Sequence, residues 1–194
     1  MQKQSEIIKQ LSDKQLTIQL YMSQGVIFFT AIILSLFLFE DFSRWWTLFD
    51  WQLLPIIYYG VGSGLVVVAL DIVLMKVFPS RYYDDGGINQ RIFQNRSVIS
   101  IFTIASVVAI SEEVLFRGVL QTTLGYVIAS TLFALVHIRY LSKPVLFVSI
   151  LFVSFFIGYI YELTANLWVC IIAHFTVDFL LGLLIRFRKW GAFK

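Results

Sequence analysis

The sequence predicts an all-α integral membrane protein, a bundle of about six transmembrane helices preceded by an amphipathic helix. Its 194 residues are 59% hydrophobic and only 14% charged, whereas soluble domains are nearer half apolar and a quarter charged. The mean hydropathy is +0.82. The apolar residues gather in stretches that approach the about 20 residues needed to cross a bilayer. We expect residues 1–194 to form a single membrane domain.

The chain begins with a polar segment. Residues 5–16 place Ile7, Ile8 and Leu11 among charged side chains at near-helical spacing. This pattern fits an amphipathic helix lying on the membrane surface, and it fits an irregular polar tail equally well.

Five apolar stretches follow that are long enough, or nearly so, to span the bilayer: residues 20–39, 53–77, 97–124, 144–161 and 163–185. A sixth stretch, residues 126–138, is short for a span. We expect it either to extend by a turn at one end or to be partly buried in protein.

Loop charges set the expected orientation. Three lysines precede the first span, four basic residues lie in residues 76–96, and four more lie in residues 186–194. The 40–51 loop instead carries three acids and one arginine. Because cytoplasmic loops are rich in Lys and Arg, we expect both termini in the cytoplasm. The net charge of +3 does not indicate nucleic-acid binding, since the basic residues form no stripe on a polar domain.

Small residues give two further indications. Gly60 and Gly64 lie four residues apart within a span, a spacing typical of close helix packing in membranes. Cys170 is the one cysteine of the chain, which excludes an intramolecular disulfide. It lies four residues before His174, so a Cys–His nucleophile is conceivable, but a small buried apolar role is favoured.

Three of the apolar stretches carry ionisable side chains that complement one another. Such groups cost several kcal/mol each in hydrocarbon and mark functional sites or paired networks. Both histidines of the chain are among them. The residues are Glu112, Glu113, Arg117, His137, His174 and Asp178. Three segments with complementary polar groups predict one buried polar site built from several helices.

Helical spacing pairs some of these groups locally. Glu113 and Arg117 are four residues apart and can form an ion pair on one helix face, whereas Glu112 points about 100° away. His174 and Asp178 are also four apart. Taken singly, each feature is explained by packing, as an ionic lock or a satisfied core histidine. Taken together, they favour a site, because Glu112 has no local partner.

Two kinds of chemistry fit this set. Glutamate and histidine side chains can ligate zinc and leave a position open for water. Alternatively, a glutamate and a histidine can deprotonate water directly while the second histidine and its neighbour stabilise an oxyanion. Either route leads to attack of water on a carbonyl, and so to amide hydrolysis inside the membrane. A transporter is a weaker alternative, because no internal repeat supports it.

The same residues carry a resemblance to a known family. The three segments read EExxxR from Glu112, FxxxH from Phe133 and HxxxD from His174. In this order, on separate helices, they resemble the CPBP family, the CAAX protease and bacteriocin-processing group, also called Abi, which includes the Rce1-type prenyl-protein endopeptidases. The resemblance covers residues 97–186, the expected catalytic-motif core.

The resemblance implies an α-helical intramembrane endopeptidase of a bacterial cell membrane. Its substrate would be a protein or peptide, lipidated ones included. Glu112 and His137 are implied to activate water, with His174 and Asp178 completing the site. Glu113 and Arg117 become supporting residues. Phe133, one turn before His137, is expected to pack against that ring.

The family leaves two questions open. Many relatives carry asparagine where this chain has Asp178, and aspartate brings a charge without a donor. Family members are labelled metalloproteases, yet a metal-free glutamate mechanism is also proposed. The set Glu112, His137 and His174 could therefore hold Zn²⁺ or act without it. The alternative to an enzyme is a catalytically silent membrane scaffold or bacteriocin-immunity protein of the same fold.

Overall fold

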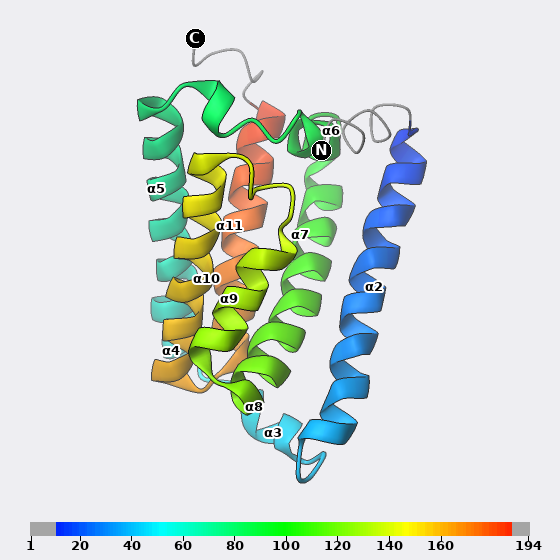
Figure 1. The fold of residues 1–194 in the computed structure, drawn as a ribbon, viewed down its shortest axis with the longest axis vertical. Helices are drawn as coiled ribbons and strands as arrows, with labels where there is room; N and C mark the ends of the chain where they lie inside the picture. The colour runs from blue at the N-terminus through cyan, green and yellow to red at the C-terminus, as the bar shows by residue number, and fades with distance from the viewer. Residues whose placement is uncertain (1–10, 188–194) are drawn as a thin grey trace.

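Every regular element in the described part of the chain is a helix. The computed structural model describes residues 11–187, shown in Figure 1. Five helical segments are long and apolar enough to cross a membrane. Three are single helices, α2 (Asp13–Leu38), α10 (Pro144–Thr164) and α11 (Leu167–Phe187). The segment Leu53–Val77 joins α4 (Leu53–Pro55), η1 (Ile56–Val61) and α5 (Gly62–Val77), and the segment Val98–Leu124 joins α7 (Val98–Glu113), η3 (Val114–Gln121) and α8 (Thr122–Leu124). The shorter elements are α3 (Arg44–Leu48), η2 (Ser80–Tyr82), α6 (Ile88–Phe93) and α9 (Tyr126–Val136). The all-α architecture and five of the predicted spans are confirmed.

The sixth predicted span is not a full crossing. The helix α9 has 11 residues, which corresponds to about 16 Å at 1.5 Å per residue, roughly half of a 30 Å hydrocarbon core. It starts after a sharp turn at Gly125, whose φ is +88°. It ends at His137, and residues 137–143 continue as hydrogen-bonded turns to α10. In Figure 1, α9 stops well short of the end of the bundle at which α10 begins.

The predicted surface helix over residues 5–16 needs correction at its end. Helix α2 begins at Asp13, so residues 13–16 belong to the first long helix. Ser12 caps it: the Ser12 hydroxyl accepts from the Gln15 backbone N–H, and the Gln15 side chain accepts from the Ser12 N–H. This reciprocal capping box satisfies two donors that a helix start leaves unpaired. Residues 5–10 of that prediction lie outside the described residues.

Helix α11 is the central element of the bundle. It packs against α7, η1, α5 and α10, while α2 packs on α7 and η3 at the edge. The predicted close packing at Gly60 and Gly64 is confirmed. A Cβ at Gly64 would lie 2.6 Å from the Cβ of Thr176, and a Cβ at Gly60 would lie 3.2 Å from that of Ile172. Only glycine lets these two backbones approach so closely.

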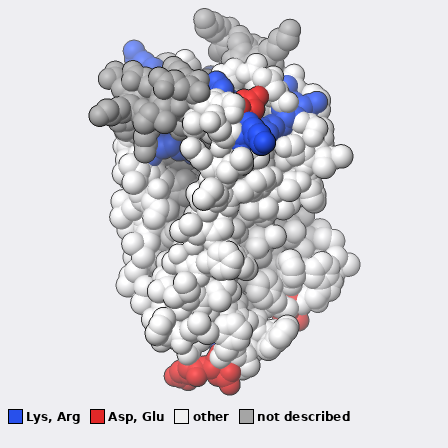
Figure 2. Space-filling model, turned by 90° about the vertical axis from the view of Figure 1, so that its right-hand side faces the viewer, with Lys and Arg blue, Asp and Glu red and all other residues white. Residues whose placement is uncertain are grey.

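Charges lie at the two ends of the bundle. Figure 2 shows Lys and Arg gathered with a small acidic group at the end where α2 starts, acidic side chains at the opposite end, and a broad uncharged band between them on this face. Helix α11 ends at the same, basic end. This distribution is that of an integral membrane protein with hydrocarbon around its middle.

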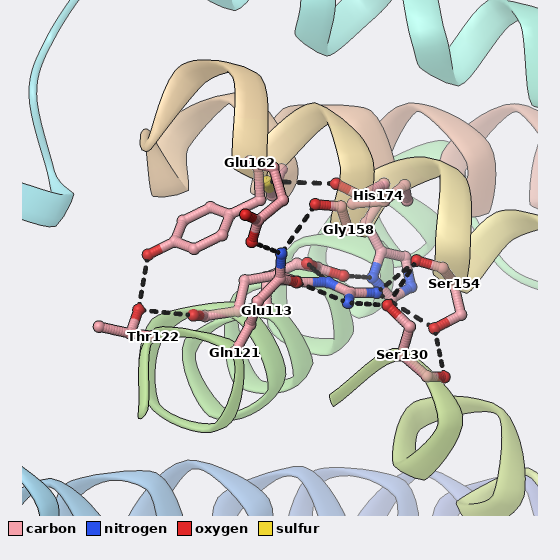
Figure 3. A network of polar contacts seen from close by, with 12 residues as sticks. Glu113, Gln121, Thr122, Ser130, Ser154, Gly158, Glu162 and His174 are labelled. Atoms are coloured by element: carbon pink, nitrogen blue, oxygen red, sulfur yellow. Dashed lines mark hydrogen bonds and ion pairs between the residues drawn. The ribbon is translucent and has the colours of Figure 1, made fainter. Parts of the chain in front are cut away.

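A buried arginine ties the central helices together. Arg117, fully buried in the π-helical segment η3 (Val114–Gln121), donates through Nε to Glu113 (3.3 Å). Its Nη1 donates to Gln121 Oε1 and Ser130 Oγ, each at 3.0 Å. Its Nη2 donates to the Ser154 carbonyl at 2.9 Å. Figure 3 shows this network. One guanidinium thus joins η3 to α9 and α10, with its charge neutralised by the predicted Glu113 pair.

The polar network continues towards the acidic end of the bundle. Gln121 Nε2 donates to the Gly158 carbonyl (2.8 Å) and to Glu162 (2.7 Å). Ser154 Oγ donates to the Ser130 carbonyl at 2.8 Å. A Cβ at Gly158 would lie 2.8 Å from an Arg117 nitrogen, so α10 comes close to the guanidinium. These hydrogen bonds hold η3, α9 and α10 against one another.

Arg117→Ala should lower the free energy of unfolding by about 3–5 kcal/mol, because it leaves the Glu113 carboxylate buried without its partner. Melting of the purified protein in detergent measures the loss. Arg44→Ala is the control, since Arg44 is exposed in α3 and surface changes stay within about 0.5 kcal/mol. Equal melting of the two variants would contradict this account.

Candidate active site

The predicted polar residues come together from three elements. Glu112 and Glu113 are the last two residues of α7, directly before the π-helical η3. His137 is the residue that ends α9, and His174 and Asp178 lie on α11. Short π-helical segments occur frequently at functional sites, because they shift the faces that a helix presents. Arg117 lies in η3, and the ion pairs arrange the six predicted residues in two neighbouring groups. Glu113 and His174 link Arg117 to Asp178, while Glu112 faces His137. The Phe133 ring contacts both histidines.

Only one of the two carboxylate oxygens of Glu112 has a hydrogen-bond partner among the described residues. Its Oε1 accepts a hydrogen bond from Gln24 Nε2 at 3.2 Å. Its Oε2 is buried and has no hydrogen-bond partner among the described residues. Buried polar atoms are almost always bonded, so an exception in a native structure calls for a reason. Glu112 Oε2 lies 3.9 Å from Nε2 of His137, which is too long for a direct hydrogen bond.

His137 is held in a defined orientation. Its Nδ1 lies 2.7 Å from the carbonyl oxygen of Phe133. A carbonyl oxygen can only accept, so Nδ1 carries the hydrogen, and in the neutral form of the ring the Nε2 lone pair points towards Glu112. The ring packs between those of Phe133 and Tyr140, with centroid distances of 4.9 and 5.7 Å. Glu112 and His137 thus face each other with two acceptor atoms.

The second histidine lies between two carboxylates. His174 Nδ1 is 2.8 Å from Glu113 Oε1, and its Nε2 is 3.6 Å from Asp178 Oδ2. Glu113 therefore binds Arg117 with one oxygen and His174 with the other. The predicted pairing of Glu113 with Arg117 is confirmed, but Glu113 also orients a candidate site residue. Glu112 and Glu113 do face different partners, as their angular separation predicts.

Phe133 fills the space between the two histidines. Its ring is buried, and it lies 4.9 Å from the His137 ring and 5.9 Å from the His174 ring, measured between centroids. The Arg117 guanidinium lies 5.4 Å from its centroid on the other side. The expected packing of Phe133 on His137 is confirmed. This aromatic ring therefore lies between the histidine of the Arg117–Glu113 network and the histidine that faces Glu112.

Two contacts were not anticipated from the sequence. Gln24 lies near the middle of α2, and its partner Glu112 is 88 residues away. A polar amide within an apolar span is itself a signal that could have indicated it. The Asn89 amide donates to the Tyr140 hydroxyl at 3.1 Å, which ties α6 to the turns beside His137.

Cys170 is buried in the core, as expected for a small apolar residue, and its thiol lies 3.9 Å from the Ile157 carbonyl oxygen.

The expected zinc ligands do not form a metal centre in this arrangement. Zinc needs three or four ligand atoms within about 2.0–2.3 Å of one point. Within residues 11–187, no three His, Cys, Asp or Glu side chains converge in this way. Nδ1 of His174 is bonded to Glu113 and Nδ1 of His137 to a carbonyl, which leaves only the Nε2 atom of each ring as a potential ligand. Glu112 Oε2 and His137 Nε2, which lie 3.9 Å apart, nevertheless provide two acceptors for one water molecule.

Comparisons with known proteins agree with the motif pattern. Residues 94–180 match the family model of the Rce1-like type II CAAX prenyl endopeptidases. The chain is similar to the uncharacterized protein YpbD of Bacillus subtilis (strain 168), with 46% identity over 167 residues that cover 86% of this chain and 88% of that protein. No solved structure matches significantly. The chain belongs to the Rce1-like type II CAAX prenyl endopeptidase family.

Proposed function

We propose that the protein is an intramembrane endopeptidase in which Glu112 and His137 activate the attacking water. The observation that carries the proposal is the unpaired, buried Oε2 of Glu112, 3.9 Å from the Nε2 of His137. A water molecule has two hydrogens, and it can donate one to each of these acceptors at ordinary hydrogen-bond lengths. Family membership supports a protease with a protein substrate.

The reaction then proceeds by general base catalysis. The water attacks the carbonyl carbon of the peptide bond, and its proton passes to the Glu112–His137 pair. The tetrahedral intermediate collapses when the amine leaving group takes up a proton from the same pair. Positioned acid–base groups of this kind contribute about 10²–10⁴ in rate. No step requires a group beyond the side chains, the substrate and the water.

His174 is suited to stabilise the oxyanion. When the ring carries both protons, Nδ1–H donates to Glu113, at 2.8 Å. Nε2 lies 3.6 Å from Asp178, so its N–H is free to bind the negative oxygen of the intermediate. A preorganised donor at that position contributes much of the rate in acyl transfer. Asp178 then orients and balances the charge of the imidazolium rather than donating a hydrogen bond.

The kind of substrate is inferred from family membership, and the orientation in the membrane from the loop charges. We infer that the enzyme cuts near the C-terminus of a small protein or peptide, lipidated ones included, within a bacterial cell membrane. The basic end of the bundle, where α2 begins and α11 ends, faces the cytoplasm under the rule that cytoplasmic loops are rich in Lys and Arg. The whole chain acts as one membrane domain with the motif core at residues 97–186.

Glu112→Gln should lower cleavage by about 10²–10⁴, because the amide cannot take up the water proton. The fold should be nearly intact, since the side chain keeps its shape. The measurement compares peptides released in membranes of cells that express wild-type or variant protein at equal levels. Peptides seen only with the wild type identify substrates, and purified protein then gives their cleavage rates.

Glu40→Gln serves as the matched control, because Glu40 is exposed beyond the end of α2. It should release the same peptides as the wild type. Identical peptide sets from wild-type and Glu112→Gln membranes would contradict the proposal, and they would favour a catalytically silent membrane scaffold of the same fold.

A single cysteine placed by Asp50→Cys, in a Cys170→Ala background, should react with an impermeant thiol reagent only from outside the cell. Asp84→Cys, in the loop before α6, should react only after the cytoplasmic side is opened. The reason is that the 40–51 loop is acidic and the 76–96 segment basic. Labelling of Asp50→Cys solely from the cytoplasm would invert the proposed orientation.

A further inference from the structure

Helix α2 is the least buried of the five long helical segments, yet the Gln24 amide on it lies in the site. Its large apolar side chains at Met22, Val26 and Phe29 are each about two-thirds exposed, whereas Gln24 is only 7% exposed. An uncharged polar side chain in the middle of a span still costs free energy when its hydrogen bonds are incomplete. The position of Gln24 on this helix therefore needs a reason other than solubility or packing.

Stability explains Gln24 poorly. Its Nε2 donates to Glu112 Oε1 at 3.2 Å, but its own Oε1 is buried without a partner among the described residues. A half-satisfied buried amide is less favourable than an apolar side chain of the same shape. Ser35, on the same helix, gives the contrast. Its hydroxyl donates to the Ile32 carbonyl (2.8 Å) and accepts from Trp45 Nε1 (3.2 Å), as a structural polar residue should.

We propose that Gln24 is a positioning residue, which holds the carboxylate of Glu112 so that Oε2 points at His137. The proposal rests on the proposed function above. A carboxylate has two equivalent oxygens and a freely turning terminal bond, so one fixed oxygen directs the other. Catalytic groups must stay within about 0.5 Å of their productive geometry. Among residues 11–187, Gln24 is the one group that donates a hydrogen bond to either oxygen of Glu112.

The consequence is that the site extends beyond the family's motif region. The family match spans residues 94–180, and Gln24 comes from a helix that precedes it. Helix α2 packs on α7 and η3, so the contact depends on how that helix is seated. The first span is thus part of the catalytic apparatus and not only a membrane anchor.

Gln24→Met tests the proposal, because methionine keeps the length of the side chain and removes both amide groups. We expect kcat to fall about 10- to 100-fold, the rate equivalent of one hydrogen bond to a charged group. KM should change less than twofold, since the amide acts on Glu112 and not on the substrate. The melting temperature of this single variant should fall modestly, because Glu112 Oε1 then loses its donor; the division of the effect between kcat and KM carries the test.

Two variants of the same helix are the controls. Gln19→Met makes the same change at an exposed position and should alter neither kcat nor melting. Ser35→Ala leaves Trp45 Nε1 without its acceptor, so it should lower the melting temperature and keep kcat. A loss of kcat in Gln24→Met that is absent from Ser35→Ala separates a positioning role from a structural one.

The double variant Gln24→Met/Glu112→Met gives a readout that needs no substrate. It removes both partners and both unpaired oxygens, so it should melt at or above the wild-type temperature. A double variant that melts below wild type as Ser35→Ala does would show a structural brace and overturn the proposal.

The outcomes also separate this inference from the proposed function. A wild type that cleaves, with Glu112→Gln inactive and Gln24→Met at full kcat, overturns the role of Gln24 alone. A loss confined to KM would also overturn it, because the amide would then bind substrate. A wild type that cleaves nothing overturns both.

Discussion

The buried charge of Arg117 is the constraint on which the rest of this structure depends. A guanidinium inside a membrane bundle is tolerated only if its charge is balanced and its donors are bonded. Glu113 supplies the balancing charge, and acceptors on η3, α9 and α10 take the remaining donors. These bonds fix three helices relative to one another. Because Glu113 uses its second oxygen for His174, the same constraint also sets the second histidine on α11.

Two adjacent glutamates thereby acquire different roles. Glu113 has both oxygens bonded to cationic or donor groups, so it has no capacity left to take up a proton from water. Glu112 has one oxygen bonded to Gln24 and one unpaired. The unpaired atom is buried and faces a histidine whose other nitrogen is already committed. The site's reactivity therefore follows from what the surrounding helices leave unsatisfied, and not from the residue types alone.

Much of this arrangement could be predicted from the sequence. The apolar lengths located four of the five long helices within a few residues, and helical spacing gave the Glu113–Arg117 pair and the separate direction of Glu112. The depth of His137 could not be predicted. The short α9 ends partway along the bundle, and the turns that follow it return to the end of the bundle where α10 begins. The end of that helix is set by packing, which local pattern does not encode.

The contact of α2 with the site also could not be predicted from the local sequence pattern. Gln24 and Glu112 are far apart in the chain, and only the packing of α2 on α7 brings them together. The start of α2 at Asp13 depends on the Ser12 cap and not on where the apolar residues begin. Residues 13–16 could belong either to a surface helix or to an extended first span. The capping hydrogen bonds of Ser12 place them in the first span.

The central claim is that Glu112 and His137 act on one water as a unit, and a double-variant rate measurement tests it most directly. The kcat of Glu112→Gln, His137→Ala and the combined variant would be measured on one identified substrate. Groups that act as a unit are strongly non-additive, so the combined variant should be no slower than the slower single variant. Rate losses that multiply in the combined variant would contradict the shared water.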